Sequence, residues 1–343
     1  MKIGLYAHTH GVSYRDAQNK FVKSIPATTT RPVEVAQRAE RAGFHSMWFP
    51  DHVCMPLSST SGHVVNESRT RGYEPRHEML DGAVVMGAVA AATSRLRLGT
   101  SVLIAPYRGP LNDARQLATI DVLSGGRLIA GVGAGWMEEE FAALGVPFAE
   151  RGARTDECIE IYKRAWCDEV VSFTGRHYRF ANLSMDPKPV QKPRPPIVYG
   201  GVTAGGARRA ARSCDGLYPL FLDPGADPFR YAGLQDVVRR ELEAQRRDPG
   251  CFLMLAATSM RVTDAADSAG QSSQRRPLCT GTPEQVLEDL ERFAAAGYSL
   301  VICAFDCPSH TVTELCEQID RAGREILPAA ADIVPRGGWQ PVE

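Results

Sequence analysis

Short apolar runs alternate with helix-type segments along nearly the whole chain. The runs are almost continuously apolar, which is typical of parallel strands covered on both faces. Eight of them are expected to be strands: Ile3–Ala7, Ser46–Phe49, Leu96–Val102, Leu128–Val132, Ile197–Tyr199, Gly216–Pro219, Phe252–Ala256 and Leu300–Ala304. The alternation predicts eight βα units and a parallel sheet.

Helix boundaries are marked by capping residues. Thr30 is expected to cap a helix that has Pro32 in its first turn and ends before Gly43, and Thr282 is expected to cap another. Between residues 155 and 167, apolar side chains recur at helical spacing and predict one buried stripe. Its members are Cys158, Ile159, Tyr162, Ala165 and Trp166.

The glycines favour a closed barrel over a doubly wound sheet. A dinucleotide-binding sheet carries Gly-x-Gly-x-x-Gly after its first strand, whereas here His8-Thr9-His10-Gly11 follows it. The glycine clusters follow the fourth and fifth strands instead. We therefore predict an α/β fold, a (β/α)₈ TIM barrel formed by residues 1–330 as a single domain, with residues 331–343 as a C-terminal tail.

Three segments exceed ordinary loop lengths, and we interpret them as insertions after strands 2, 4 and 7. They are Pro50–His77, Asp168–Pro196 and Thr263–Leu278. The first two are expected on the face where barrel active sites lie. The second contains a predicted hairpin, Val171–Phe173 with His177–Phe180, and the third is rich in Ser and Gln, as disordered segments are.

Composition excludes several functional classes. The 39 basic and 40 acidic residues give a net charge of -1, which disfavours nucleic-acid and membrane binding. The nine cysteines show no paired spacing of a disulfide framework or zinc cluster. No secretory signal or stretch of 18 apolar residues is visible, so the expected location is cytoplasmic. The expected partner is a small-molecule substrate.

A glycine-rich turn at Tyr199–Ala207 is the clearest candidate anion site. Successive N–H groups and a helix N-terminus there are able to face a phosphate, with Gly200, Gly201, Val202 and Thr203 as the contacts. The alternative interpretation is a tight strand-to-helix turn.

Strand four ends in Gly131, Gly133 and Gly135, which make room for a planar ring or for a packed bend of the barrel. Trp136 follows as a pocket wall or a surface aromatic. Glu138 and Glu139 suit the start of a helix.

Asp51-His52 follows strand two and is a candidate for proton transfer, because a carboxylate is able to orient an imidazole. His8 lies at a similar depth after strand one. The alternative interpretation is that the Asp51-His52 pair and His8 are ordinary loop residues without a catalytic role. No metal constellation, Ser-His-Asp motif or P-loop is visible, which directs attention to an organic cofactor.

Five segments together resemble the luciferase-like monooxygenase superfamily over almost the whole chain. They are Leu98–Val102, Gly131–Trp136 with Glu140-Phe141, Arg154–Glu157, Tyr199–Gly201 and Gly281–Glu284. The superfamily includes flavin-dependent monooxygenases and oxidoreductases that use the deazaflavin coenzyme F-420. The resemblance implies the barrel, a cofactor phosphate at the turn from Gly200, and a non-proline cis peptide at Ser101-Val102 that supports the cofactor ring.

Two features resemble the coenzyme F-420 branch. Asp51-His52 matches that branch's aspartate-histidine pair, and strand four ends in Val-Gly-Ala-Gly-Trp, unlike the Asn-Val-Val-Thr type of many FMN-dependent members. Trp136 stands where the branch's sugar-phosphate dehydrogenases have a catalytic glutamate. We therefore expect a flatter or more apolar substrate, such as an enone, an imine or a polyketide-like carbonyl.

The resulting hypothesis is hydride transfer between coenzyme F-420 and a small organic substrate. His52 exchanges the proton and Asp51 orients it. Ser101, Val102 and Gly133 support the ring, while Trp136 and His8 border the substrate. The alternatives are a monooxygenase that uses reduced FMN and O₂, and a flavin-binding barrel without turnover. The resemblance also implies a homodimer.

Overall fold

The computed structural model describes residues 1–9, 12–15, 21–62, 78–220, 228–231, 233–265, 276–308 and 311–340. Some of the predictions above concern residues beyond these ranges. They are His10 and Gly11, the part of Pro50–His77 from residue 63 on, and residues 266–275 of the Ser/Gln-rich segment.

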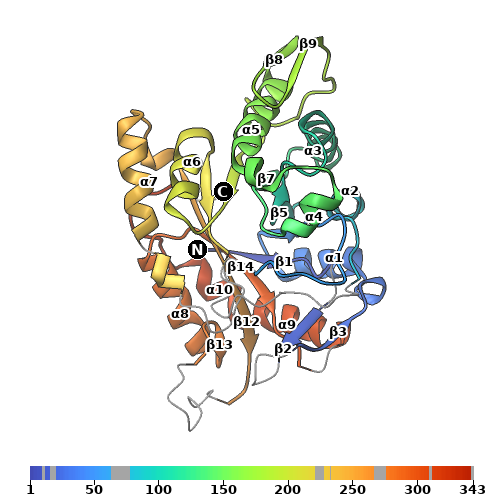
Figure 1. Ribbon diagram of the computed structural model, residues 1–343. Coiled ribbons are helices and arrows are strands. Elements are labelled where there is room, and N and C mark those ends of the chain that lie inside the picture. The colour runs from blue at the N-terminus through green and yellow to red at the C-terminus, as the bar shows by residue number, and fades with distance from the viewer. Residues whose placement is uncertain are drawn as a thin grey trace.

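Eight parallel strands close into a barrel, as predicted (Figure 1). Neighbouring strands pair in chain order, and the ring closes where Lys2 stands opposite Leu300. The strands are β1 (Lys2–Tyr6), β4 (Ser46–Phe49), β5 (Arg97–Thr100), β7 (Leu128–Gly133), β10 (Ile197–Gly200), β11 (Gly216–Tyr218), β12 (Leu253–Val262) and β14 (Leu300–Phe305). Each overlaps one of the eight apolar runs, so these runs were sufficient to locate the strands.

Helices surround the barrel (Figure 1). The longer ones are α1 (Pro32–Ala42), α2 (Gly82–Ala92), α3 (Pro110–Ser124), α5 (Arg151–Cys167), α6 (Ala204–Ser213), α7 (Gly233–Ala244), α8 (Pro283–Ala295) and α9 (Val312–Glu325). Shorter helices are α4 (Glu138–Ala143), α10 (Leu327–Ala331) and the 3₁₀ turns η1 (Ala27–Thr29), η2 (Phe148–Glu150), η3 (Pro228–Tyr231) and η4 (Pro249–Cys251). None of the helices among the described residues is both long and apolar enough to cross a membrane.

The two faces of the strands bury separate apolar layers. Inside the barrel, the Trp48 and Tyr218 rings pack with centroids 5.1 Å apart. A Cβ atom on Gly99 would lie 2.4 Å from the Trp48 ring, so this glycine makes room for the indole. The outer layer packs the strands against the helices and includes the predicted stripe of α5, which is buried.

One helix cap is confirmed and one is wrong. The Thr282 hydroxyl accepts the N–H of Gln285, and Gln285 completes a capping box. Thr30 does not cap α1, because Arg31 holds that position in a left-handed conformation (φ 44°). The Thr30 hydroxyl instead donates to the carbonyl of Ala27 in the preceding 3₁₀ turn, 2.8 Å away.

The long segment Asp168–Pro196 does not lead out of strand four at the mouth, as we had expected. It follows helix α5 and therefore returns to the amino ends of the strands. Gln191 donates to the carbonyl of Leu128, the first residue of β7. The predicted hairpin is present as β8 (Val171–Thr174) and β9 (Arg179–Leu183), which lies beside α5 at the top of Figure 1. The tip of the hairpin runs back along α5, where the N–H groups of Arg176 and Tyr178 donate to the Glu157 carboxylate.

Further short strands were not predicted. The hairpin of β2 (Val12–Arg15) and β3 (Phe21–Ile25) follows β1, while β6 (Leu103–Ile104) runs beside β7 and β13 (Thr280–Gly281) beside β12. At the C-terminal end, the buried Trp339 ring packs against Phe252, and the Gln340 N–H donates to the Phe252 carbonyl.

Candidate active site

The carboxyl ends of the parallel strands meet at one mouth of the barrel, where most candidate residues lie. His8 follows β1, His52 follows β4, Ser101 and Val102 follow β5, Trp136 follows β7, and the turn from Gly200 ends β10. This is the end of a barrel at which catalytic groups from different strands converge.

His52 is held by a glutamate from a different βα unit. Its Nδ1 lies 2.6 Å from Oε2 of Glu140, on helix α4. The Tyr107 hydroxyl donates to the same oxygen at 2.8 Å. The other oxygen, Oε1, accepts the backbone N–H groups of Val53 (2.6 Å) and Cys54 (3.1 Å). Glu140 thus fixes both the imidazole and the backbone that follows it.

The Glu140 carboxylate is fully buried and ionised. Burial acts to raise the pKa of Glu140, but the hydrogen bonds from His52, Val53 and Cys54 outweigh that effect and lower it. The pKa of Tyr107 is raised, first by burial and then by the charge of Glu140, so this residue stays a phenol that donates. A buried anion with this many donors is a fixed element of the site.

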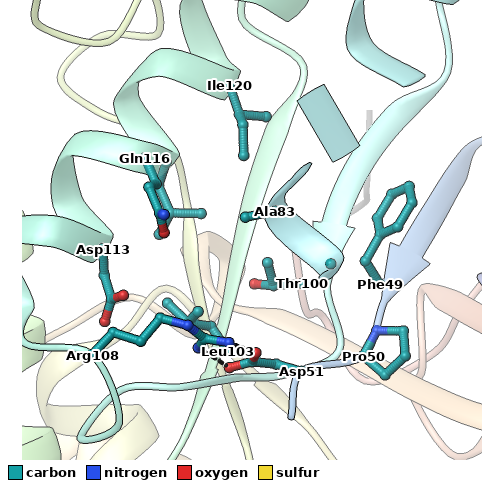
Figure 2. A pocket seen from close by; sticks show the side chains of 12 residues that line it. Phe49, Pro50, Asp51, Ala83, Thr100, Leu103, Arg108, Asp113, Gln116 and Ile120 are labelled. Atoms are coloured by element: carbon teal, nitrogen blue, oxygen red, sulfur yellow. Dashed lines mark hydrogen bonds and ion pairs between the residues drawn. The ribbon is translucent and has the colours of Figure 1, made fainter. Parts of the chain in front are cut away.

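Asp51 does not orient His52, which corrects our expectation. Its carboxylate forms a two-pronged ion pair with Arg108, at 2.5 and 2.8 Å, and accepts the N–H of Ile104 at 2.9 Å. Figure 2 shows Asp51 and Arg108 together with Asp113 around a cavity of about 20 Å³, room for about one water molecule. Consecutive side chains of an extended segment point to opposite sides, so Asp51 faces the helix layer while His52 turns to the mouth.

Trp136 lies beside His52, as a wall of the predicted site would. The two rings stand edge to face, with centroids 6.1 Å apart and planes at 86°. The turn before Trp136 depends on Gly135, which has φ +83° and lies where a Cβ would meet the Phe141 ring at 2.6 Å. Gly135 therefore serves a packed bend, and this bend places Trp136 next to His52.

Four of the predicted cofactor residues come together around the Val102 side chain. The Ser101-Val102 peptide is cis, as the resemblance implied. A Cβ on Gly133 would lie 2.6 Å from Val102, and one on Gly200 would lie 2.7 Å from it. The Ser101 hydroxyl shares a 2.9 Å hydrogen bond with the Tyr218 hydroxyl. The two glycines thus make room for Val102 rather than leaving a vacant slot.

The glycine-rich turn leads directly into helix α6. Thr203 is the N-cap, and its hydroxyl accepts the N–H of Gly206. The N–H of Gly201 is directed to the Tyr218 carbonyl at 3.3 Å. No described contact uses the backbone N–H groups from Val202 to Gly205. They are therefore available to an external acceptor at the partly positive end of the helix.

His8 is buried at the end of β1, and its ring lies edge to face with Tyr6 at 6.4 Å. Its Nε2 has no hydrogen-bond partner in the described part of the chain. Burial lowers the pKa of His8 to about 4, so the ring is neutral near pH 7. A neutral imidazole nitrogen without a partner is suited to accept or donate one hydrogen bond to a ligand.

The segment after β4 has a second anchor on α4. Oε1 of Glu139 accepts the N–H of Thr60 (2.7 Å), and Oε2 accepts the hydroxyl of Ser61 (2.7 Å). Glu139 therefore does more than favour a helix start. Together with Glu140, it ties residues 53–61 to the barrel wall beside Trp136.

The sequence did not reveal three residues of this arrangement. Glu140 entered only as part of a family motif, and Tyr107 and Arg108 were not singled out. Their signal was weak: a tyrosine and an arginine just after strand three, at the depth of the mouth.

The comparisons with known proteins agree with the fold and identify the family. The sequence model of the family described as luciferase-like monooxygenase matches residues 1–279. A protein of Mycobacterium tuberculosis, described only as uncharacterised, is 35% identical over 216 residues, which cover 63% of this chain and 70% of that protein. The FMNH₂-dependent dimethylsulfone monooxygenase of Pseudomonas putida is 25% identical over 342 residues, covering 88% and 87%.

Solved structures share the fold over nearly the whole chain. A monooxygenase from Streptomyces bottropensis has a TM-score of 0.73 at 22% identity, covering 96% of this chain and 99% of the other. A secondary alcohol dehydrogenase dependent on coenzyme F-420, in complex with an adduct of the coenzyme and acetone, has a TM-score of 0.72 at 20% identity and the same coverage. The chain is therefore similar to proteins of both cofactor types.

Proposed function

The chain belongs to the luciferase-like monooxygenase family, and on that premise we propose that it transfers a hydride between coenzyme F-420 and a small organic substrate. The observation that carries the proposal is His52, held at the barrel mouth by the buried, ionised Glu140. Interconversion of a carbonyl or imine with its reduced form moves a proton as well as a hydride. A fixed imidazole is suited to exchange that proton.

The residues of the mouth fit a deazaflavin. Val202 and Thr203 would hold its phosphate with their backbone N–H groups at the N-terminus of α6, and Gly200 and Gly201, which have no side chains, would let it approach. Ser101, Val102 and Gly133 would support the ring; the Val102 side chain fills the place that Gly133 leaves open. When bound, the deazaflavin supplies a carrier of two electrons and a proton that works as a hydride donor or acceptor.

The protein's own side chains have separate tasks in this proposal. His52 gives or takes the proton at the reacting atom of the substrate. Trp136 borders the substrate beside His52 and excludes water, and the unpartnered Nε2 of His8 fixes its polar end. Asp51 supports the site from behind, because it holds Arg108 and the backbone of Ile104.

Apolar groups near the mouth favour an apolar carbonyl, enone or imine as substrate. Val53 and Leu57 are 45% and 66% exposed and lie on the segment that Glu139 and Glu140 anchor beside Trp136. Contact between exposed apolar side chains and an apolar ligand removes both from water and so stabilises the complex.

A monooxygenase reaction with reduced FMN and O₂ is the second candidate. It is favoured by the dimethylsulfone monooxygenase, a relative that aligns over 88% of this chain. The test is anaerobic mixing of the protein with coenzyme F-420 and a panel of secondary alcohols, enones and imines. We expect substrate-dependent change in the absorbance of the coenzyme without oxygen. Turnover only with reduced FMN, accompanied by oxygen uptake, would contradict the proposal.

A further inference from the structure

Glu140 is a buried carboxylate, and its four hydrogen-bond partners among the described residues are all groups able to donate. Two are the backbone N–H groups of Val53 and Cys54, which are able only to donate a hydrogen bond. The third is the Tyr107 phenol, which keeps its proton because its pKa is raised by burial and by the charge of Glu140. The fourth is Nδ1 of His52, 2.6 Å from Oε2.

The protonation of Nδ1 follows from these contacts. An ionised carboxylate is able only to accept, so an imidazole nitrogen within hydrogen-bond distance of it must carry the proton. A deprotonated Nδ1 would place two acceptors 2.6 Å apart in a site without solvent contact, because Glu140 is 0% exposed. The local geometry therefore selects one of the two neutral tautomers of His52.

We propose that Glu140, with Tyr107, is a positioning residue that holds His52 in the Nδ1-protonated tautomer and thereby makes Nε2 the nitrogen that exchanges the proton. This rests on the proposed function of His52. Glu140 touches neither substrate nor cofactor in this account and acts only through the histidine. Tyr107 supports it by donating to Oε2, the same oxygen that binds the imidazole.

The bend at the end of β7 makes this arrangement possible. Gly135 adopts φ +83° and leaves no room for a Cβ against Phe141, and α4 begins three residues later at Glu138. The bend places Trp136 against one side of the His52 ring and Glu140 at its Nδ1. One turn of chain thus fixes both the position of the ring and its tautomer.

The direct test is ¹⁵N NMR of the histidine side chains, with the His52 signals assigned by their loss in His52→Ala. In the wild-type protein at alkaline pH, where an imidazole is neutral, we expect Nδ1 to be the protonated nitrogen. In Glu140→Gln, the amide oxygen is expected to stay on the N–H groups of Val53 and Cys54. Its NH₂ group then donates to Nδ1, so the tautomer should invert. Glu138→Gln, exposed in the same helical turn, is the matched control and should leave the wild-type pattern.

Activity provides the second readout. Glu140→Gln should lower kcat about 10²-fold or more, in the range for loss of acid–base catalysis, with little change in KM. A wild-type protein with the proton on Nε2, or an unchanged tautomer in a folded Glu140→Gln, would overturn the proposal whatever the enzyme turns over. If Glu140→Gln does not fold, the wild-type measurement alone decides. An inverted tautomer with unchanged kcat would instead remove His52 from proton transfer and so contradict the proposed function.

Discussion

His52 and Asp51 are neighbours in the chain but belong to different parts of the molecule. The His52 ring faces Glu140 and Trp136 at the mouth, while Asp51 neutralises Arg108 behind the barrel wall. Substitutions at the two positions are therefore expected to have different consequences. Loss of Asp51 removes the two-pronged partner of a partly buried guanidinium and leaves it only the 4.0 Å contact with Asp81, which lowers the stability of the fold.

Loss of the imidazole acts on chemistry. We expect His52→Ala to bind the cofactor as the wild-type protein does and to lose about 10²- to 10⁴-fold in rate, the usual range for a general acid or base. Single-turnover kinetics beside cofactor titration separate the two quantities. A His52→Ala enzyme with wild-type rate would exclude this proton route.

The buried imidazole of His8 is expected to make the stability of the protein depend on pH. Its folded-state pKa is lowered by burial from 6.5 to about 4, so between these values the unfolded chain binds a proton that the folded protein does not. Its contribution to stability is therefore lost as the pH falls, by up to about 3 kcal/mol near pH 4. Urea unfolding from pH 7 to pH 4 should show a shallower decline for His8→Leu than for the wild type. Parallel curves for the two proteins would mean that His8 titrates normally.

Contacts of this kind limit what the sequence predicts at the residue scale. His52 was a candidate because it follows a strand, but Glu140 lies 88 positions away and no local pattern joins them. The same holds for Asp51, whose true partner Arg108 lies beyond the next strand. Pairing across βα units follows from barrel closure and side-chain direction, which a one-dimensional pattern does not contain.

At the scale of elements, the turn from β10 to α6 has the sharpest test. Gly201→Asp should weaken cofactor binding at least 10-fold, because it places a carboxylate beside the phosphate site. Gly201→Asn is the matched control, since its side chain has the same size and no charge. Both meet the Tyr199 ring, 2.8 Å from a Cβ at this position, so any packing defect is shared. Equal affinities of the Asp and Asn variants, measured by titration, would remove the phosphate from this turn.

The elements themselves were largely predictable, and their exceptions have physical causes. Parallel strands are buried on both faces, so all eight appear as apolar runs. The helix cap at Thr30 was wrong because a 3₁₀ turn recruits its hydroxyl. The segment Asp168–Pro196 was wrongly assigned to the end of strand four, because helix α5 separates the two.

In the whole molecule, helix α2 has apolar side chains that the chain itself does not cover. From Gly82 to Ala92 it contains only Gly, Ala, Val and Met, and its Val84 is 73% exposed. A helix that is apolar all round is usually covered. We propose that a second copy of the chain covers it, as a two-fold symmetric homodimer.

This homodimer predicts a mass near twice 37.4 kDa in light scattering coupled to size exclusion. Val84→Glu should shift the protein to the single-chain mass, because a charge would be buried in the interface. Val334→Glu is the control, since Val334 is 79% exposed near the C-terminal end. A wild-type protein that runs as a single chain at micromolar concentration would exclude this interface.

Titration of the purified protein shows whether the barrel binds a deazaflavin for hydride transfer. Coenzyme F-420 and FMN, each oxidised and reduced, are added under anaerobic conditions and their dissociation constants compared. We expect coenzyme F-420 to bind at least 10-fold more tightly than FMN in either redox state. A deazaflavin reacts sluggishly with oxygen, so such a preference implies dehydrogenase or reductase chemistry. Binding of FMN alone, with no detectable affinity for coenzyme F-420, would contradict the account.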